Sequence, residues 1–145
     1  MKPVLYLSHF FKQNRQEYYD RLQSVRDNGT WEDWLIFFLQ GIVEVSRQAT
    51  ETARKILTLR EEHRHTITEN MGRAAGNGHR VLDYLFQHPI VSVSDVRKLI
   101  GVSNPAANNL VARLAEIEII REYTGYARNR KFINQSYFNL FHESD

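Results

Sequence analysis

One polar helix face in this chain has side chains suited to contact a nucleic acid. Apolar residues between positions 104 and 117 recur at helical spacing, which leaves Asn104, Asn108, Asn109 and Arg113 on the opposite face. An asparagine amide can pair with N6 and N7 of adenine, and an arginine can contact guanine or phosphate. The face can therefore read the major groove of duplex DNA. The competing interpretation is a solvated helix face that binds nothing.

A basic hairpin follows this helix. Residues 119–124 and 130–133 predict two strands that pair around Gly125. The hairpin holds one acidic residue, Glu122, against four cations: Arg121, Arg128, Arg130 and Lys131. Cations so grouped can contact several phosphates or the minor groove. Edge strands also carry Lys and Arg to prevent aggregation, so this alternative stays open.

The elements before the hairpin complete a recognisable order. Periodicity predicts a helix over 81–86, a second over 94–100 that ends at Gly101, and a third from Asn104 to Ile117. Three helices followed by a hairpin make a winged helix-turn-helix, whose usual ligand is duplex DNA.

The first half of the chain predicts a helical hairpin. One apolar-faced helix begins near Pro3 and stops at Asn28-Gly29, and a long helix then runs from Trp31 into the upper sixties. Its aromatic residues are more than one hairpin can bury: Phe10, Phe11, Tyr18, Tyr19, Trp31, Trp34, Phe37 and Phe38. We expect them to pack on a second copy of the chain or on sequence outside it.

The predicted fold class is mainly α, a long helical hairpin arm followed by a winged helix-turn-helix domain with a small β-hairpin wing. Three glycines within residues 72–78 predict a linker between these parts. The predicted domains are therefore an arm at 1–71, a linker at 72–78 and a winged-helix domain at 79–145.

Composition narrows the classes of function. Lys and Arg number 19 against 17 Asp and Glu, so any affinity for nucleic acid must come from local clustering of cations. No apolar run approaches the roughly 20 residues of a membrane-spanning helix. The absence of cysteine fits a cytoplasmic protein.

The sequence predicts neither a catalytic residue nor a metal site. Glu62-x-x-His65 has the spacing of a carboxylate-bridged metal motif, but the chain holds no second copy of it. The glycines of segment 76–80 precede no Lys-Ser/Thr, so they do not form a phosphate-binding P-loop. We therefore expect no enzyme activity and no cofactor for this chain.

Several motifs resemble a known family. Residues 5–8, 14–26 with the pair Tyr18-Tyr19, and 31–39 with Trp31-x-x-Trp34 are similar to the segment after the catalytic motif in bacterial Fic proteins. Residues 82–86, 101–103 and 124–130 resemble the winged helix that ends many of those proteins. The resemblance implies a relation to enzymes that transfer AMP from ATP to hydroxyl groups of target proteins.

The resemblance carries over no catalytic residue. The family signature H-P-F-x-x-G-N-G-R belongs upstream of Leu5, and segment 76–80 has His79 where the signature has Arg. Our first hypothesis is a non-catalytic C-terminal region of a Fic-like protein, whose winged helix binds DNA and whose arm dimerises or docks. The second hypothesis is a regulatory, protein-interaction module of an adenylyltransferase. In a third hypothesis the chain belongs to an active AMP transferase, which would bind ATP and Mg²⁺ only through the missing catalytic part.

Overall fold

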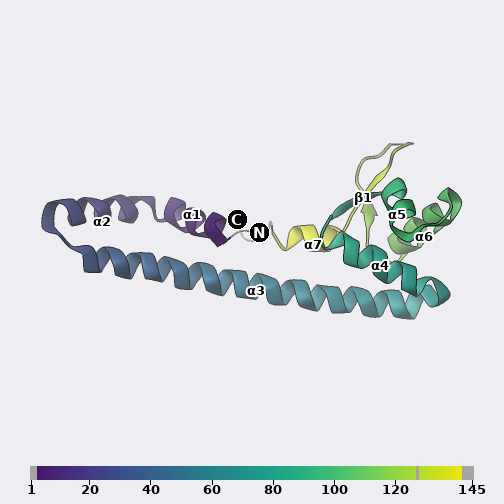
Figure 1. Ribbon diagram of the computed structural model, residues 1–145, viewed down its shortest axis with the longest axis horizontal. Helices are drawn as coiled ribbons and strands as arrows, with labels where there is room; N and C mark the ends of the chain where they lie inside the picture. The colour runs from purple at the N-terminus through teal and green to yellow at the C-terminus, as the bar shows by residue number, and fades with distance from the viewer. Residues whose placement is uncertain (1–2, 127, 142–145) are drawn as a thin grey trace. The chain divides into compact units, whose positions relative to one another are not determined.

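A computed structural model describes residues 3–126 and 128–141, and it is mainly helical (Figure 1). The chain divides into two compact units, Met1–Ala53 and Arg54–Asp145, each described below by itself. The elements in chain order are α1 (Pro3–Gln13), α2 (Arg15–Asn28), α3 (Trp31–Met71), the 3-10 turn η1 (Gly72–Ala74), α4 (Ala75–Leu85), β1 (Ile90–Ser92), α5 (Val93–Ile100), α6 (Asn104–Glu116), β2 (Arg121–Glu122), β3 (Lys131–Ile133) and α7 (Gln135–Asn139).

The first unit packs α1 and α2 against the start of α3 through aromatic rings. Phe11 lies at its centre, with its ring centroid 5.1 Å from that of Tyr18 and 6.1 Å from that of Phe37. Gly41 lets the helices approach closely, because a Cβ there would lie 2.7 Å from Cε1 of Phe10. The long helix from Trp31 and the stop at Gly29, which has a φ of 69°, are confirmed.

The single helix expected from Pro3 is wrong in one respect, because the structure interrupts it at Asn14. The Asn14 side-chain amide donates to the carbonyl oxygen of Phe10 at 2.9 Å, and its backbone departs from helical geometry at a ψ of 35°. Asn side chains compete in this way for helical hydrogen bonds. The result is two helices, α1 and α2, in place of one.

The second unit contains the winged helix-turn-helix. Strands pair antiparallel in the order β1-β3-β2, with Val91 opposite Phe132 and Glu122 opposite the same phenylalanine. Helices α4, α5 and α6 pack on this sheet around a common apolar core (Figure 1). The predicted fold class is confirmed. Three short elements, η1, β1 and α7, were not predicted.

The glycine-rich segment 72–78, expected to be a linker, is helical in the structure. Gly72 ends α3 with a left-handed φ of 49°, and the chain then continues through η1 into α4. Gly78 is buried where α4 meets the end of α3: an added Cβ would lie 2.9 Å from both Cγ2 of Ile67 and Sδ of Met71. Gly72 therefore allows the turn after α3, and Gly78 allows the close contact between α3 and α4.

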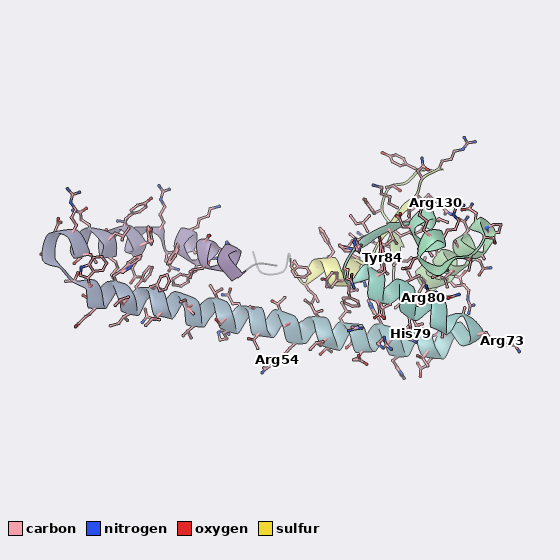
Figure 2. All side chains as sticks on the ribbon, in the orientation of Figure 1. Arg54, Arg73, His79, Arg80, Tyr84 and Arg130 are labelled. Carbon is pink, nitrogen blue, oxygen red and sulfur yellow. The ribbon has the colours of Figure 1, made fainter. Side chains whose placement is uncertain are left out.

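Residues 54–71 of α3 pack against the winged helix as part of the second unit. Arg60 binds the Asp83 carboxylate with an Nη2–Oδ1 distance of 2.7 Å, and Thr68 Oγ1 lies 3.1 Å from Nε2 of His79. Figure 2 labels His79 where α4 lies beside the end of α3. The division between compact units thus falls at residues 53 and 54, inside α3. The domain limits expected from the sequence, 1–71, 72–78 and 79–145, stay predictions. Residues 1, 2, 127 and 142–145 lie outside the described residues.

Candidate nucleic-acid interface

Helix α6 is formed by local signals at both ends. Gly101 ends α5 with a φ of 70°, and the Ser103 side chain then caps α6 by accepting from the backbone N–H of Ala106. At its other end, the N–H of Ile119 donates to the Leu114 carbonyl oxygen at 3.0 Å, and that of Glu118 to Ala115 at 3.1 Å. This is a Schellman ending, although Glu118 takes the left-handed φ of 60° where glycine is preferred.

One face of α6 is buried and the other is polar. Ala107, Leu110, Val111 and Leu114 lie in the core. Asn104 and Asn109 are exposed and Asn108 is half-buried. The Asn108 Nδ2 donates to the main-chain oxygen of Asn104 at 3.1 Å. The first two turns of α6 therefore present amides outside the core, as the sequence predicted.

Helix α5 begins beside α6 with a capping box. The Ser92 hydroxyl accepts from the Asp95 backbone N–H, and the Asp95 carboxylate accepts from the Ser92 backbone N–H at 2.9 Å and from its hydroxyl at 2.7 Å. The side-chain and backbone hydrogen bonds of Ser92 lower the pKa of Asp95 below its ordinary 3.8, and Lys98 and Lys131 lower it further. The start of α5 is thereby fixed next to the wing.

The wing is the hairpin of β2 and β3 with the loop between them. The Lys131 backbone N–H donates to the Thr124 hydroxyl at 3.1 Å, which closes the base of the loop. Gly125 and Asn129 both take left-handed conformations, with φ of 65° and 55°. Asparagine tolerates this region better than most residues. Asn129 thus lets Arg128 and Arg130 follow a tight turn.

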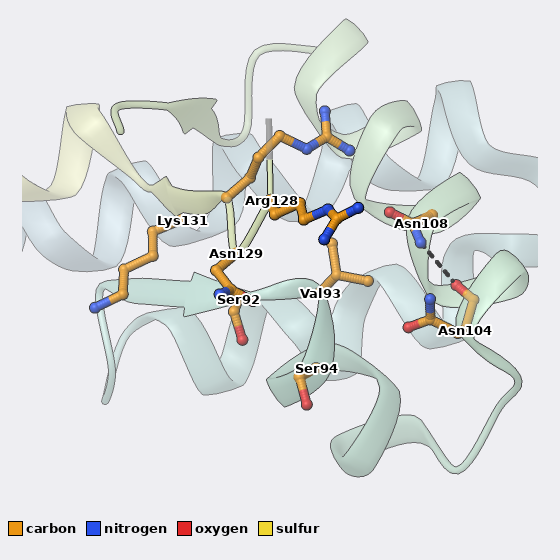
Figure 3. Close-up of a pocket in the computed structure, with 9 residues that line it drawn as sticks. Ser92, Val93, Ser94, Asn104, Asn108, Arg128, Asn129 and Lys131 are labelled. Carbon is orange, nitrogen blue, oxygen red and sulfur yellow. Dashed lines mark hydrogen bonds between the residues drawn. The ribbon is translucent and has the colours of Figure 1, made fainter. Parts of the chain in front are cut away.

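A groove of about 530 Å³ lies between the wing and the starts of α5 and α6. It is lined by Ser92, Val93, Ser94, Asn104, Asn108, Arg128, Asn129, Arg130 and Lys131. In Figure 3 the Arg128 side chain extends toward Asn104 and Asn108, whereas the Lys131 side chain points away from them. The groove therefore combines cationic, amide and hydroxyl groups with the N-termini of two helices, a setting that favours anions.

The structure brings five of the eight predicted site residues together in this groove: Asn104, Asn108, Arg128, Arg130 and Lys131. Arg130 is partly engaged within the wing, 3.8 Å from the Glu122 carboxylate and with its guanidinium carbon 5.6 Å from the centre of the Phe132 ring. Arg128 makes no ion pair or hydrogen bond to the described residues. It is the groove cation most available to a ligand.

Three predicted residues lie elsewhere. Arg113 donates to the carbonyl oxygens of Met71 at 3.0 Å and Asn70 at 3.3 Å, so its guanidinium binds the last turn of α3. Asn109 lines a second hollow of about 540 Å³, which also contains Arg113. In the pairing of β2 with β3, Arg121 lies opposite Ile133, and the next pair along the strands is Glu122 opposite Phe132. Since side chains alternate along a strand, Arg121 lies on the sheet face away from Phe132.

Sequence reasoning missed three polar residues of the groove, Ser92, Ser94 and Asn129. A signal for Ser92 was present, since Ser92-x-x-Asp95 has the spacing of a capping box. Asn129 lies in a turn-forming segment and is of a residue type that tolerates a positive φ. Nothing in the sequence alone placed these residues beside α6.

Across residues 3–126 and 128–141, no three His, Asp or Glu side chains are grouped so that they could hold a metal ion. Over the same part of the chain, no helix has the length and apolar character to cross a membrane.

The geometry agrees with a comparison to known protein families. Residues 79–132 match the family model described as an HTH DNA binding domain. The match begins within α4, takes in α5, α6 and β2, and ends within β3. Residues 79–132 thus form a helix-turn-helix domain of the DNA-binding class, and the groove lies on its α6 and wing side.

Proposed function

We propose that residues 79–132 bind duplex DNA, with α6 entering the major groove and the wing contacting the adjacent backbone. The observation that carries this proposal is the groove in which Arg128 converges with Asn104 and Asn108 on a domain of the HTH class. An α-helix about 10–12 Å across fits a major groove about 12 Å wide. Asn104 and Asn108 are then the candidates to contact base edges.

The wing supplies the electrostatic part of the proposal. Arg128 is exposed and lines the groove. Each phosphate that a cation neutralises releases counterions, so affinity falls with salt at a logarithmic slope of about −0.9 per contact. Removing Arg128 is expected to reduce that slope by about one. Arg121 is exposed and does not line the groove, so it offers the same charge outside it and is the matched control.

The test is fluorescence anisotropy of labelled duplex DNA across a salt series with the whole chain, Arg128→Gln and Arg121→Gln. We expect Arg128→Gln to weaken binding and flatten the salt dependence, and Arg121→Gln to leave the slope nearly unchanged. Equal losses in both variants would mean that general positive charge, and not the groove, holds DNA. Absence of binding at low salt would overturn the proposal.

One observation favours a second function, that of a regulatory or protein-interaction module. The chain's charges nearly balance, and two of its predicted contact arginines, Arg113 and Arg130, are engaged with other residues of the chain. The exposed Tyr123 and Tyr126 of the wing would then form the contact surface. In that case Tyr126→Ala abolishes partner binding, while Arg128→Gln does not.

We further propose that the chain is the non-catalytic C-terminal region of a Fic-like protein, with the helical arm serving dimerisation or docking. Support comes from the resemblance of residues 14–26 and 31–39 to that family, and from large apolar side chains exposed on α3. The regulatory alternative makes the chain a module of an adenylyltransferase whose catalytic motif lies outside it. This chain by itself needs no cofactor in either case.

An assay with radiolabelled ATP and Mg²⁺ tests this assignment. The chain alone is expected to transfer no AMP, because no residue corresponds to the signature histidine that would deprotonate a hydroxyl. Adding a separately produced Fic catalytic region should restore transfer, provided that it docks on the arm. Transfer of AMP by the chain alone would refute the non-catalytic assignment.

A further inference from the structure

An apolar face of α3 in the first unit is left open to solvent. Its members are between 39% and 67% exposed: Leu35, Ile36, Leu39, Ile42 and Val43. Their spacing of one, three or four residues puts them on one side of the helix, here called the α3 apolar face. The packing against α1 uses the other side, where Phe37 and Gly41 are buried. Grouped apolar exposure of this kind marks a contact surface.

Opposite charges border the two ends of the α3 apolar face. Glu32 precedes it by one helical turn and Arg47 follows it by about one turn, and both side chains are exposed. Arg47 already binds Glu44 at 2.9 Å, which holds the guanidinium near the helix surface. Glu32 lies seven positions before Leu39 and Arg47 lies eight positions after it, so the charges lie about 11–12 Å to either side of Leu39 along the helix.

This charge pattern distinguishes the ways in which two copies of α3 could pair. A parallel pair in register would put Glu32 beside Glu32 and Arg47 beside Arg47. An antiparallel pair with a two-fold axis at Leu39 puts Glu32 of each copy beside Arg47 of the other. Such a closed two-fold interface is self-complementary, with the same surface used on both copies. Apolar contact at the centre and ion pairs at both ends therefore select the antiparallel arrangement.

We propose that the α3 apolar face binds a second copy of this chain, antiparallel about a two-fold axis at Leu39, with Glu32–Arg47 ion pairs at both ends. This inference rests on the docking role proposed for the helical arm and names its partner. It is independent of the DNA groove, since every residue that it uses belongs to the first unit.

Sedimentation velocity of the whole chain, from about 1 to 200 µM, measures the association. Leu39→Glu places two carboxylates together at the axis and should weaken dimerisation on the order of a hundredfold, since like charges in contact are strongly unfavourable. Leu57→Glu is the matched control, because Leu57 is 61% exposed on the same helix. Its counterpart across the axis would precede Trp31, the first residue of α3, so the dimer should persist.

A charge exchange tests the antiparallel register. Glu32→Arg and Arg47→Glu each put like charges together, so each should weaken the dimer about tenfold. The double variant restores opposite charges across the axis and should recover the original affinity. Far-UV circular dichroism of each variant checks that its helix content is unchanged, which is expected because all these side chains are exposed.

Three outcomes would overturn the proposal: a monomer at every concentration, a dimer indifferent to Leu39→Glu, or a double variant no better than the single ones. A monomer that binds a separate Fic catalytic region through Leu39 would overturn self-association while leaving the docking role of the arm intact. DNA binding provides a separate readout, since Arg128→Gln should alter the salt slope without changing the sedimentation of the protein.

Discussion

Adding a methyl group at Gly78 tests whether residues 72–78 are a linker or part of a packed helix. An alanine Cβ would lie 2.9 Å from Ile67 Cγ2 and from Met71 Sδ, and both of those side chains are buried. Overpacking of this kind costs about 1–3 kcal/mol. Replacing glycine in a helix also gains up to about 1 kcal/mol. We expect Gly78→Ala to lower the free energy of unfolding by up to about 2 kcal/mol.

Gly76→Ala is the control, because it makes the same chemical change two residues earlier in α4. No atom lies within 4 Å of a Cβ at Gly76, so only the gain in helix propensity applies there. The two variants should therefore differ by about 1–3 kcal/mol. Urea denaturation followed by far-UV circular dichroism measures the difference, and hydrogen exchange of the α4 amides locates it.

The result that would refute this reasoning is an equal response of the two variants. If Gly78→Ala and Gly76→Ala both leave stability unchanged or raise it alike, α4 does not pack on α3 through Gly78. Residues 72–78 would then act as the flexible linker that their composition suggests.

The remaining predictions concern stability. Glu118→Gly should stabilise the chain by about 1 kcal/mol in thermal unfolding, because Glu118 holds a φ of 60°; a lower melting temperature would contradict this. Burial lowers the pKa of His63 below 6.5, and the charge of Glu62 opposes this shift. The unfolded chain therefore takes up the proton at a higher pH than the folded chain does, so stability should fall as pH drops below 6.5. His63→Gln should remove this pH dependence of stability, and persistence of the dependence in that variant would disprove the prediction. Asp95→Ala should cost about 0.5–2 kcal/mol through loss of the capping box with Ser92. Because the pKa of Asp95 is lowered in the folded chain, the stability that its carboxylate adds is complete above pH 3.8 and is lost as pH falls through the lower folded value. If the stabilities of the original chain and of Asp95→Ala fall in parallel as pH is lowered, this prediction is contradicted.

The winged-helix elements could be predicted because their signals are local. Gly101 marks the end of α5 and the apolar spacing of α6 sets its buried face, and the structure confirms both. Strand β1 was missed because three residues are too few for a period to be visible. The linker was predicted from glycine content alone. The role of Gly78 depends on Ile67 and Met71, side chains that only the tertiary structure brings to it.

The candidate site was predicted in part for the same reason. Arg128 and Asn108 are twenty residues apart, and the sequence predicted each as a candidate contact, one on the wing and the other on the third helix. The contact of Arg113 with the Met71 carbonyl spans 42 residues and has no signature in the sequence. The orientation of Arg121 depends on the strand register, since a shift of one residue would turn it to the opposite face.

The position of Arg113 affects how a genetic screen of this chain would be interpreted. Its guanidinium joins the helix expected to read DNA to the main-chain oxygens at the end of α3. Losing it leaves those carbonyls without this donor and loosens the attachment of α6. A selection for loss of the proposed DNA binding would therefore recover Arg113 together with Arg128. Only Arg113 variants should regain DNA binding in a background carrying a general stabilising substitution such as Glu118→Gly.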